Sequence, residues 1–222
     1  MNFDPASRSK LTARDHGRFA GDALFARVAR SVCDAECLPR KELYEAWEVA
    51  RRARRRFRGG RVLDLACGHA LVAHLMLILD DSSPVALGVD TRLPNSAPRL
   101  SAQLVKQWPR LTGRVRLVEG SLDSVECEAS DLVVSCHACG ALTDRVLEKA
   151  MRASARVVVL PCCHEKSPAA EGGLGGWLDP ALAIDVTRAA TLRSNGYVVY
   201  TQAIPPAITP KNRLLMGEPS RG

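Results

Sequence analysis

The side chains that could do chemistry gather in two short segments, each directly after an apolar run. They are Cys136, His137, Cys139, Cys162, Cys163 and His164. Thiolates and imidazoles bind zinc, a thiol such as that of Cys162 can act as a nucleophile, and an imidazole such as that of His137 can take a proton. Small thiol side chains also pack around a ligand or fill a core. We keep these interpretations open and expect no structural metal, because the spacing is unusual for a zinc finger.

A second group of residues is typical of a nucleoside cofactor site. The run VLDLACGHA at 62–70 follows a predicted strand and opens a predicted helix. It lacks the GxGxxG pattern of dinucleotide-binding proteins. It resembles motif I of S-adenosylmethionine (SAM) methyltransferases, with Asp64 as the acid and Ala66 and Gly68 as the small residues. Asp64 could bind the ammonium of the cofactor, and Gly68 lets the backbone approach a ligand closely.

Two later positions complete this expected site. Asp90 follows Asp64 by 26 residues, which fits one strand–helix–strand unit, and ends a strand where an acid can bind both ribose hydroxyls. Ser121 and Leu122 follow the next strand, where Leu122 could pack on the adenine base.

Alternating apolar and helical segments predict the elements that position these residues. Strands are expected at 61–66, 84–90, 114–120, 131–136, 155–163, 196–204 and 212–218, with helices at 69–79, 95–107, 143–154 and 180–194. Two N-terminal helices are expected at 11–37 and 40–57. The link between the last two strands is too short for a crossover, so this pair should be antiparallel. The prediction is an α/β, Rossmann-like class I methyltransferase fold: a seven-stranded, mostly parallel sheet with an antiparallel last strand.

Three stretches carry a more specific resemblance. HACGALTD at 137–144, followed by PCCH at 161–164, is similar to motifs of the methyltransferase family that includes the eukaryotic tRNA ribose methyltransferases. RKELYE at 40–45 and TPKNRLL at 209–215 resemble further stretches of that family. The resemblance covers roughly residues 40–217 and implies SAM-dependent methyl transfer.

The resemblance also implies roles for single residues. Lys41, Tyr44 and Cys136 would lie with the cofactor-binding residues Asp64, Ala66, Gly68, Asp90, Ser121 and Leu122. The catalytic candidates are His137, Cys139, Asp144 and Cys162, with Thr143 shaping the site. His137 is the preferred base, since it lies where the catalytic motif of methyltransferases follows the fourth strand.

The net charge of +7 lies entirely in the N-terminal quarter. Residues 1–61 hold 15 basic and 8 acidic residues, and seven arginines fall within residues 51–61. Such a run can bind phosphates. We therefore expect a basic helical extension over 1–58, a SAM-binding domain over 59–222, and RNA as the leading methyl acceptor.

Two other functions stay open. A small-molecule methyltransferase could use the Gly-rich loop after Cys163, with Trp177, as a lid. A regulator without turnover could bind SAM or a metal through the same residues. No membrane segment or export signal is expected, and the cysteine usage fits free thiols in the cytoplasm. The oligomeric state is left open.

Overall fold

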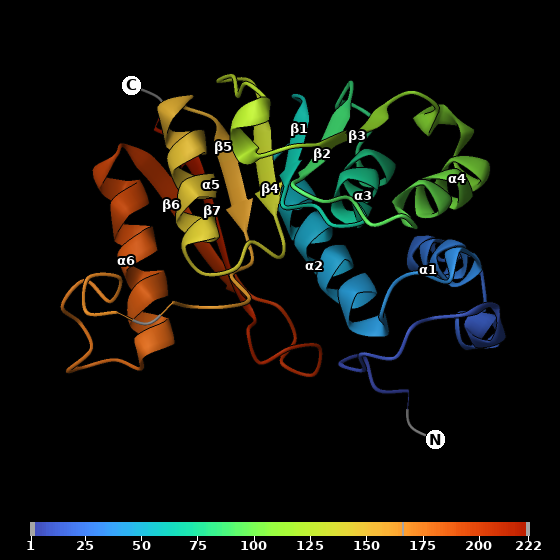
Figure 1. The fold of residues 1–222 in the computed structure, drawn as a ribbon, viewed down its shortest axis with the longest axis horizontal. Coiled ribbons are helices and arrows are strands. Elements are labelled where there is room, and N and C mark those ends of the chain that lie inside the picture. The colour runs from blue at the N-terminus through green and yellow to red at the C-terminus, as the bar shows by residue number, and fades with distance from the viewer. Residues whose placement is uncertain (1–2, 166, 221–222) are drawn as a thin grey trace.

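The computed structural model describes residues 3–165 and 167–220, and its centre is one seven-stranded sheet (Figure 1). The strands are β1 (Val62–Leu65), β2 (Ala86–Asp90), β3 (Val115–Glu119), β4 (Leu132–Ser135), β5 (Arg156–Val159), β6 (Tyr197–Ala203) and β7 (Arg213–Pro219). Their order across the sheet is β3-β2-β1-β4-β5-β7-β6. The first five are parallel, and β7 is antiparallel to both β5 and β6. The predicted fold class is confirmed.

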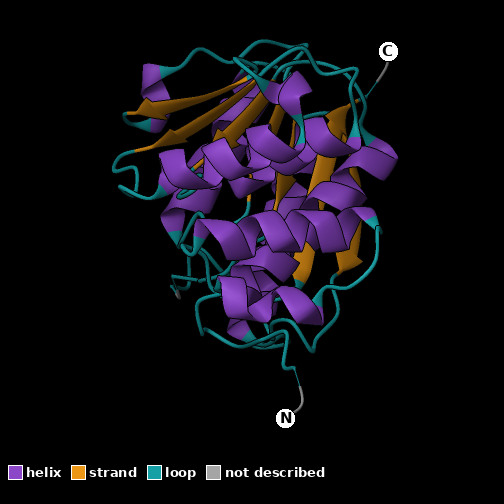
Figure 2. Cartoon of the chain, turned by 90° about the vertical axis from the view of Figure 1, so that its right-hand side faces the viewer, coloured by secondary structure: helices purple, strands orange, loops and turns teal. Residues whose placement is uncertain are grey.

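Helices cover both faces of this sheet. They are α1 (Leu24–Ala35), α2 (Arg40–Arg56), α3 (Leu71–Leu79), α4 (Ala97–Gln107), α5 (Ala141–Arg152) and α6 (Pro180–Ser194), with short 3-10 helices η1 (Ala13–Arg18), η2 (Pro109–Leu111) and η3 (Leu122–Ser124). Helices α1 to α4 lie on one side, which faces the viewer in Figure 2, and α5 and α6 lie on the other. No described helix is both long and apolar enough to cross a membrane.

Alternation along the central strands divides the core into two layers. In β1, Val62 belongs to the buried cluster under α2 and α3, whereas Leu63 belongs to the cluster on the α5 side. On β5, Val158 likewise belongs to the cluster under α2 and α3, and Val157 belongs to the cluster on the α5 side. A parallel strand buried on both faces reads as a continuous apolar run, which is why these strands were recognisable.

The N-terminal region differs from the prediction in one respect. The single helix expected at 11–37 is wrong, because the chain forms η1, then an irregular link, and only then α1. Gly21 in the link has φ +82°, a conformation that ends helical geometry. The buried cluster that contains Phe19 and Val28 continues through α2 into β1. The expected boundary at 58/59 therefore falls inside one core.

Candidate functional site

A pocket of about 490 Å³ lies where β1, β2 and β4 end. Parallel strands end at the same edge of the sheet, and the order changes direction between β1 and β4, the usual place for a ligand. The turn from β1 into α3 forms one wall, with Asp64, Ala66 and Gly68, and Asp90 of β2 lies beside it.

The turn after β1 is unusually tight. Ala66 and Ala70 have φ 56°, and Gly68 has φ 52°, so three alternate residues adopt the left-handed conformation. This conformation costs a residue with a side chain about 1–2 kcal/mol. Strand β2 closes on the same turn, since a Cβ at Gly88 would lie 2.6 Å from the Cβ of Ala70. The backbone is thereby drawn along the pocket wall as motif I predicts.

Asp64 sits at the bottom of this turn and is 1% exposed. Its Oδ2 accepts a hydrogen bond from the backbone N–H of Ala73 at 3.0 Å, in the first turn of α3. Burial raises the pKa of Asp64 to about 8, although that hydrogen bond acts in the opposite direction. A buried carboxyl without a counter-charge is stabilised in its charged form by any cation that enters the pocket.

Asp90 connects the end of β2 to the turn after β1. Its Oδ2 accepts from the N–H of Gly68 at 2.9 Å, and its Oδ1 accepts from the N–H of Arg92 at 3.2 Å. Asp90 and Ala66 also line an adjoining recess of about 60 Å³, which Ser121 and Leu122 close. The expected positions after β1, β2 and β3 therefore line two neighbouring cavities that share Ala66 and Asp90.

Helix α2 supplies a further wall of the pocket, as the resemblance of RKELYE implied, but through residues that the sequence did not single out. Glu42 and Ala46, one turn apart, line the pocket. Glu45 is 1% exposed; its Oε1 accepts from Lys41 Nζ at 2.6 Å, and its Oε2 lies 3.9 Å from His137 Nε2 with no hydrogen-bond partner among the described residues. The signal for Glu45 was its place in RKELYE, three residues after Glu42 on a helix whose first turns reach the pocket.

His137 and Cys136 enter the same space from the loop after β4. Cys136 is buried against the pocket, and the His137 side chain is 38% exposed at its edge. Burial raises the pKa of Glu42, and the nearby His137 acts against this rise. The His137 imidazole therefore lies between the solvent-open pocket and the carboxyl groups of Glu42 and Glu45.

Two sequence candidates lie elsewhere. The Tyr44 ring packs on Phe25 with centroids 5.1 Å apart, on the face of α2 turned away from Glu42. Asp144 forms a two-point ion pair with Arg188 of α6, with Nε to Oδ1 at 2.7 Å and Nη2 to Oδ2 at 2.9 Å. Neither residue lines the pocket: Tyr44 belongs to an aromatic cluster and Asp144 to a link between α5 and α6.

The thiols converge only in part. Cys139 lines the pocket, and its Sγ lies 3.2 Å from that of Cys162. Burial raises the pKa of both thiols. His164 turns away, and its Nε2 lies 2.7 Å from Oδ1 of Asp185 in α6. The six side chains at the ends of β4 and β5 thus divide among the pocket, a thiol cluster and a structural ion pair.

The arginine run also has a structural role. Arg54 is 3% exposed and lies 3.2 Å from Asp80, and Arg52 pairs with Glu48. Arg56 pairs with Glu218 of β7. The run ends α2, whose 17 residues span about 25 Å, so it lies at the far edge of the sheet from Glu42. Most of its charge holds the fold together and does not face the pocket.

The sheet order, the antiparallel β7 and the pocket after β1 and β2 define a class I SAM-dependent methyltransferase, with SAM as its cofactor. Residues 41–168 match the family model described as a methyltransferase domain, and the chain belongs to that family. The match begins in α2, in agreement with the contribution of this helix to the pocket.

Solved structures with the same fold are distant in sequence. An O-methyltransferase family protein from Burkholderia thailandensis aligns with a TM-score of 0.55 at 20% identity, over 97% of this chain and 66% of its own. A protein from Clostridium thermocellum described as an rRNA methylase aligns with a TM-score of 0.54 at 14% identity, over 79% of this chain and 96% of its own. The ribosomal protein L11 methylase from Lactobacillus delbrueckii subsp. bulgaricus aligns with a TM-score of 0.51 at 12% identity, over 80% of this chain and 77% of its own. The chain thus spans just under two thirds of the first of these proteins. Curated protein sequences gave no match.

Proposed function

We propose that the protein methylates a hydroxyl group of RNA, a ribose hydroxyl in the first place, with His137 as the general base. The observation that carries this proposal is the placement of the His137 imidazole at the pocket edge, 3.9 Å from the unpartnered Oε2 of buried Glu45. The resemblance of HACGALTD to the tRNA ribose methyltransferase motif supports the same acceptor.

The residues of the pocket fit SAM. In the proposal, Asp64 binds the cofactor ammonium, since its buried carboxyl has no cation beside it. Asp90 binds the ribose hydroxyls with the lone pairs that its two backbone contacts leave free. Ser121 and Leu122 hold the adenine in the small recess, and Cys136 packs beside the methionine part. Bound SAM supplies an electrophilic methyl group.

His137 then does the proton chemistry. Its imidazole accepts the proton of the acceptor hydroxyl as the oxygen forms its bond to the methyl carbon. Glu45 stabilises the imidazolium that results, and Lys41 fixes the other carboxylate oxygen of Glu45. Glu45 is therefore a positioning residue, and His137 is the catalytic one. General-base catalysis of this kind contributes about 10²- to 10⁴-fold to a rate.

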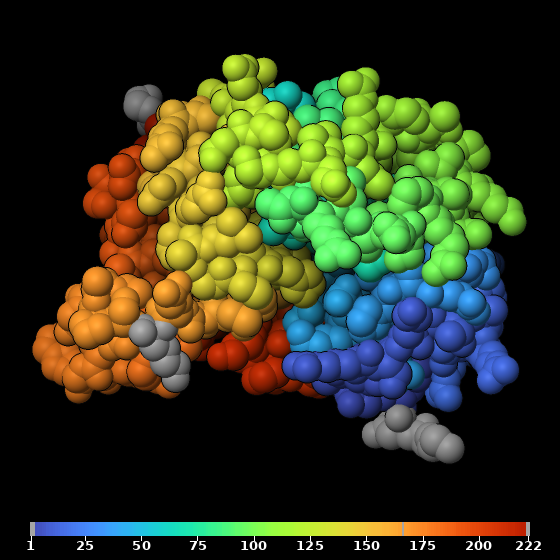
Figure 3. Space-filling model, in the orientation of Figure 1, coloured from blue at the N-terminus to red at the C-terminus, as the bar shows by residue number. Residues whose placement is uncertain are grey.

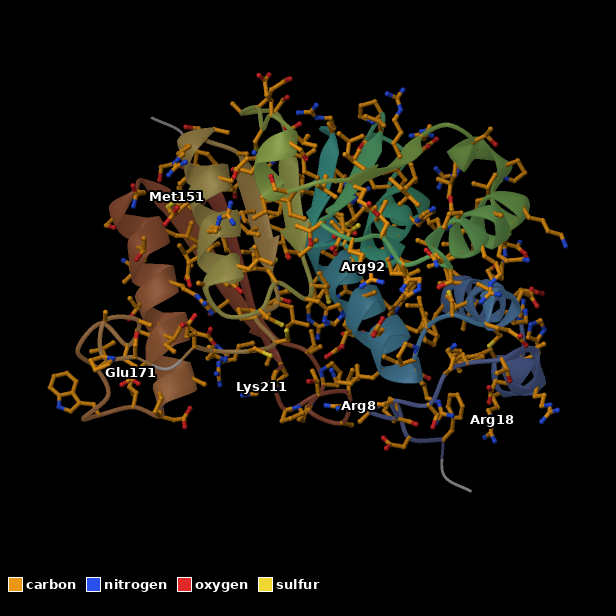
Figure 4. All side chains as sticks on the ribbon, viewed as in Figure 1. Arg8, Arg18, Arg92, Met151, Glu171 and Lys211 are labelled. Carbon is orange, nitrogen blue, oxygen red and sulfur yellow. The ribbon has the colours of Figure 1, made fainter. Side chains whose placement is uncertain are left out.

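Four exposed cations support RNA as the proposed acceptor. Arg8, Lys10, Arg92 and Lys211 form no ion pair with the acidic residues of 3–165 and 167–220. Figure 4 shows Arg8, Arg92 and Lys211 at the end toward which the parallel strands point, with Met151 at the opposite end. We call these four residues the mouth cations. They replace the arginine run as the proposed phosphate contacts.

Small molecules are the competing class of methyl acceptor. The Gly-rich loop after Cys163, which was expected to form a lid over such an acceptor, gives this alternative little support. The loop after Cys163 lies against α6, where a Cβ at Gly172 would meet Thr187. Figures 3 and 4 place this loop, with Glu171, far from the N-terminal residues that border the pocket. Trp177 is 88% exposed. Eight free cysteines fit the cytoplasm as the proposed location.

The base is tested by replacing His137 and Glu45 separately. His137→Ala should lower kcat by about 10²- to 10⁴-fold, with little change in SAM affinity. Glu45→Gln should lower kcat while leaving the KM for SAM unchanged, because the imidazolium loses the carboxylate that stabilises it. His16→Ala, a histidine replacement at an exposed pair with Asp34, is the matched control. An unchanged kcat in His137→Ala refutes the assignment.

The acceptor is tested with methyl-labelled SAM and a cell extract divided beforehand into RNA, protein and small-molecule fractions. Label that ribonuclease releases from the RNA fraction supports the proposal, and label confined to the small-molecule fraction overturns it. Arg8→Ala, Lys10→Ala and Arg92→Ala combined should reduce the salt dependence of RNA binding by a slope of about 2, at ~0.7 per phosphate contact on single strands. The combined replacement of Arg55 and Arg58, two exposed cations of the arginine run, should leave that slope unchanged.

A further inference from the structure

Three thiols meet beside the pocket without forming a disulfide. Cys139 lies in the loop after β4, and Cys162 and Cys163 lie after β5. Their Sγ atoms are all within 4.8 Å of one another, and the shortest separation is the 3.2 Å between Cys139 and Cys162. All three cysteines are free thiols. A disulfide requires about 2.05 Å between sulfurs, so these contacts are those of separate groups.

The fold brings these thiols together through the backbone. Strands β4 and β5 are adjacent and parallel, with Ser135 paired to Val159. Beyond the ladder, Leu160 N–H donates to the carbonyl of Ser135 at 3.0 Å, and Gly140 N–H donates to the carbonyl of Cys163 at 3.2 Å. The two loops are therefore held side by side for several residues past the sheet. The juxtaposition of the thiols follows from main-chain contacts and does not depend on one side-chain rotamer.

The separations match a tetrahedral thiolate site. Zinc binds thiolate sulfur at about 2.3 Å, which places the sulfurs of a tetrahedral site about 3.8 Å apart. The Cys139–Cys162 separation of 3.2 Å and the other two separations, neither above 4.8 Å, are compatible with this value after small side-chain shifts. Among the described residues no fourth histidine, cysteine or carboxylate joins the cluster. Three protein ligands and one open position are the pattern of reactive zinc sites, whereas closed structural sites have four.

We propose that Cys139, Cys162 and Cys163 together bind one Zn²⁺ ion, with a water molecule in the fourth position. Binding displaces the three thiol protons, because the ligands are thiolates. Cys139 and Cys163 are exposed, so the fourth position faces solvent. Since Cys139 also lines the pocket, the ion would lie at the mouth through which a methyl acceptor enters. This site is independent of whether RNA or a small molecule is methylated.

Metal content and cobalt spectroscopy test the proposal without an activity assay. The full chain, purified with zinc and a reductant present, should contain about one zinc per chain by elemental mass spectrometry. Co²⁺ added to the metal-free protein should give the thiolate-to-metal absorption in the near ultraviolet, saturate at one equivalent and release protons. Cys162→Ser and Cys163→Ser, made singly, should weaken or abolish this band while near-UV circular dichroism shows a folded protein.

Cys127→Ser is the matched control, because Cys127 is a half-exposed thiol on the far side of α5. It should keep the full equivalent of metal. Three results overturn the proposal: no thiolate band with Co²⁺, equal metal loss in Cys127→Ser, or a Cys139–Cys162 disulfide peptide as the dominant form in protein kept under zinc and reductant. The last result would identify the pair as a redox couple.

Discussion

Replacing Asp64 with Asn should change how the stability of the cofactor-free protein depends on pH. Burial raises the folded-state pKa of Asp64 from 3.8 to about 8, so between these values the folded chain holds a proton that the unfolded chain has lost. For an acid with a raised pKa, stability is present at low pH and is lost as pH rises. Each pH unit costs about 1.4 kcal/mol, so an increase from about pH 5 to pH 7.5 costs about 3 kcal/mol. Asn carries no charge at either pH and escapes this cost.

Urea unfolding of the wild type and Asp64→Asn at both pH values measures the effect. The amide oxygen of Asn can still accept from Ala73, so the shape of the turn is retained. The variant should gain about 3 kcal/mol relative to the wild type between the two pH values, and should bind SAM more weakly at both. If the variant and the wild type differ in unfolding free energy by the same amount at both pH values, Asp64 ionises normally in the fold. That result would refute the reasoning from burial.

Three further replacements test the packing around the site. Arg54→Ala should lower the free energy of unfolding by about 3–5 kcal/mol, because it removes the closer and buried one of the two arginines that pair with buried Asp80, whereas Arg55→Ala should stay within about 0.5 kcal/mol. His74 is fully buried and its pKa is lowered to about 4, so acidification from pH 6.5 to 4 should cost the wild type about 3 kcal/mol relative to His74→Gln, and parallel pH curves would contradict this. Tyr197→Phe removes a buried hydroxyl whose one proton is shared between the carbonyls of Ala150 and Ala155, at 3.0 and 2.9 Å, and should cost about 1–2 kcal/mol in the same assay.

The parts of the fold that follow from local chemistry were predictable. Strands buried on both faces, such as Val157–Val159, are apolar without interruption, and the short link before Arg213 requires an antiparallel return. The site residues after β1 and β2 follow from the same rule, since parallel strands place their ends together. The boundary of α1 was missed, because Phe19 has the helical spacing of a core residue but reaches the core from an irregular link.

The features that the sequence could not predict depend on ion pairs between residues that are far apart in the chain. Seven arginines within residues 51–61 indicate a phosphate-binding surface only until their partners are known, and Asp80 and Glu218 come from distant parts of the chain. Asp144 stands inside a motif of the expected family, yet Arg188 of α6 takes both of its oxygens. Glu45 lies in RKELYE, a stretch that the resemblance singled out, but the sequence of a helix rich in charged residues does not show which carboxylate is buried.

The position of β7 between β5 and β6 has a consequence for how the protein is made. β6 leaves the ribosome before β7, but it cannot join the sheet until β7 has paired with β5. Until then the edge of β5 exposes unpaired backbone groups, together with Val157 and Val158, which are fully buried in the finished fold. Such an edge can pair with a strand of another chain. Completion of the sheet is thus a late step of synthesis, and a ribosome stalled before Arg213 would hold a nascent chain whose β5 edge is still unpaired.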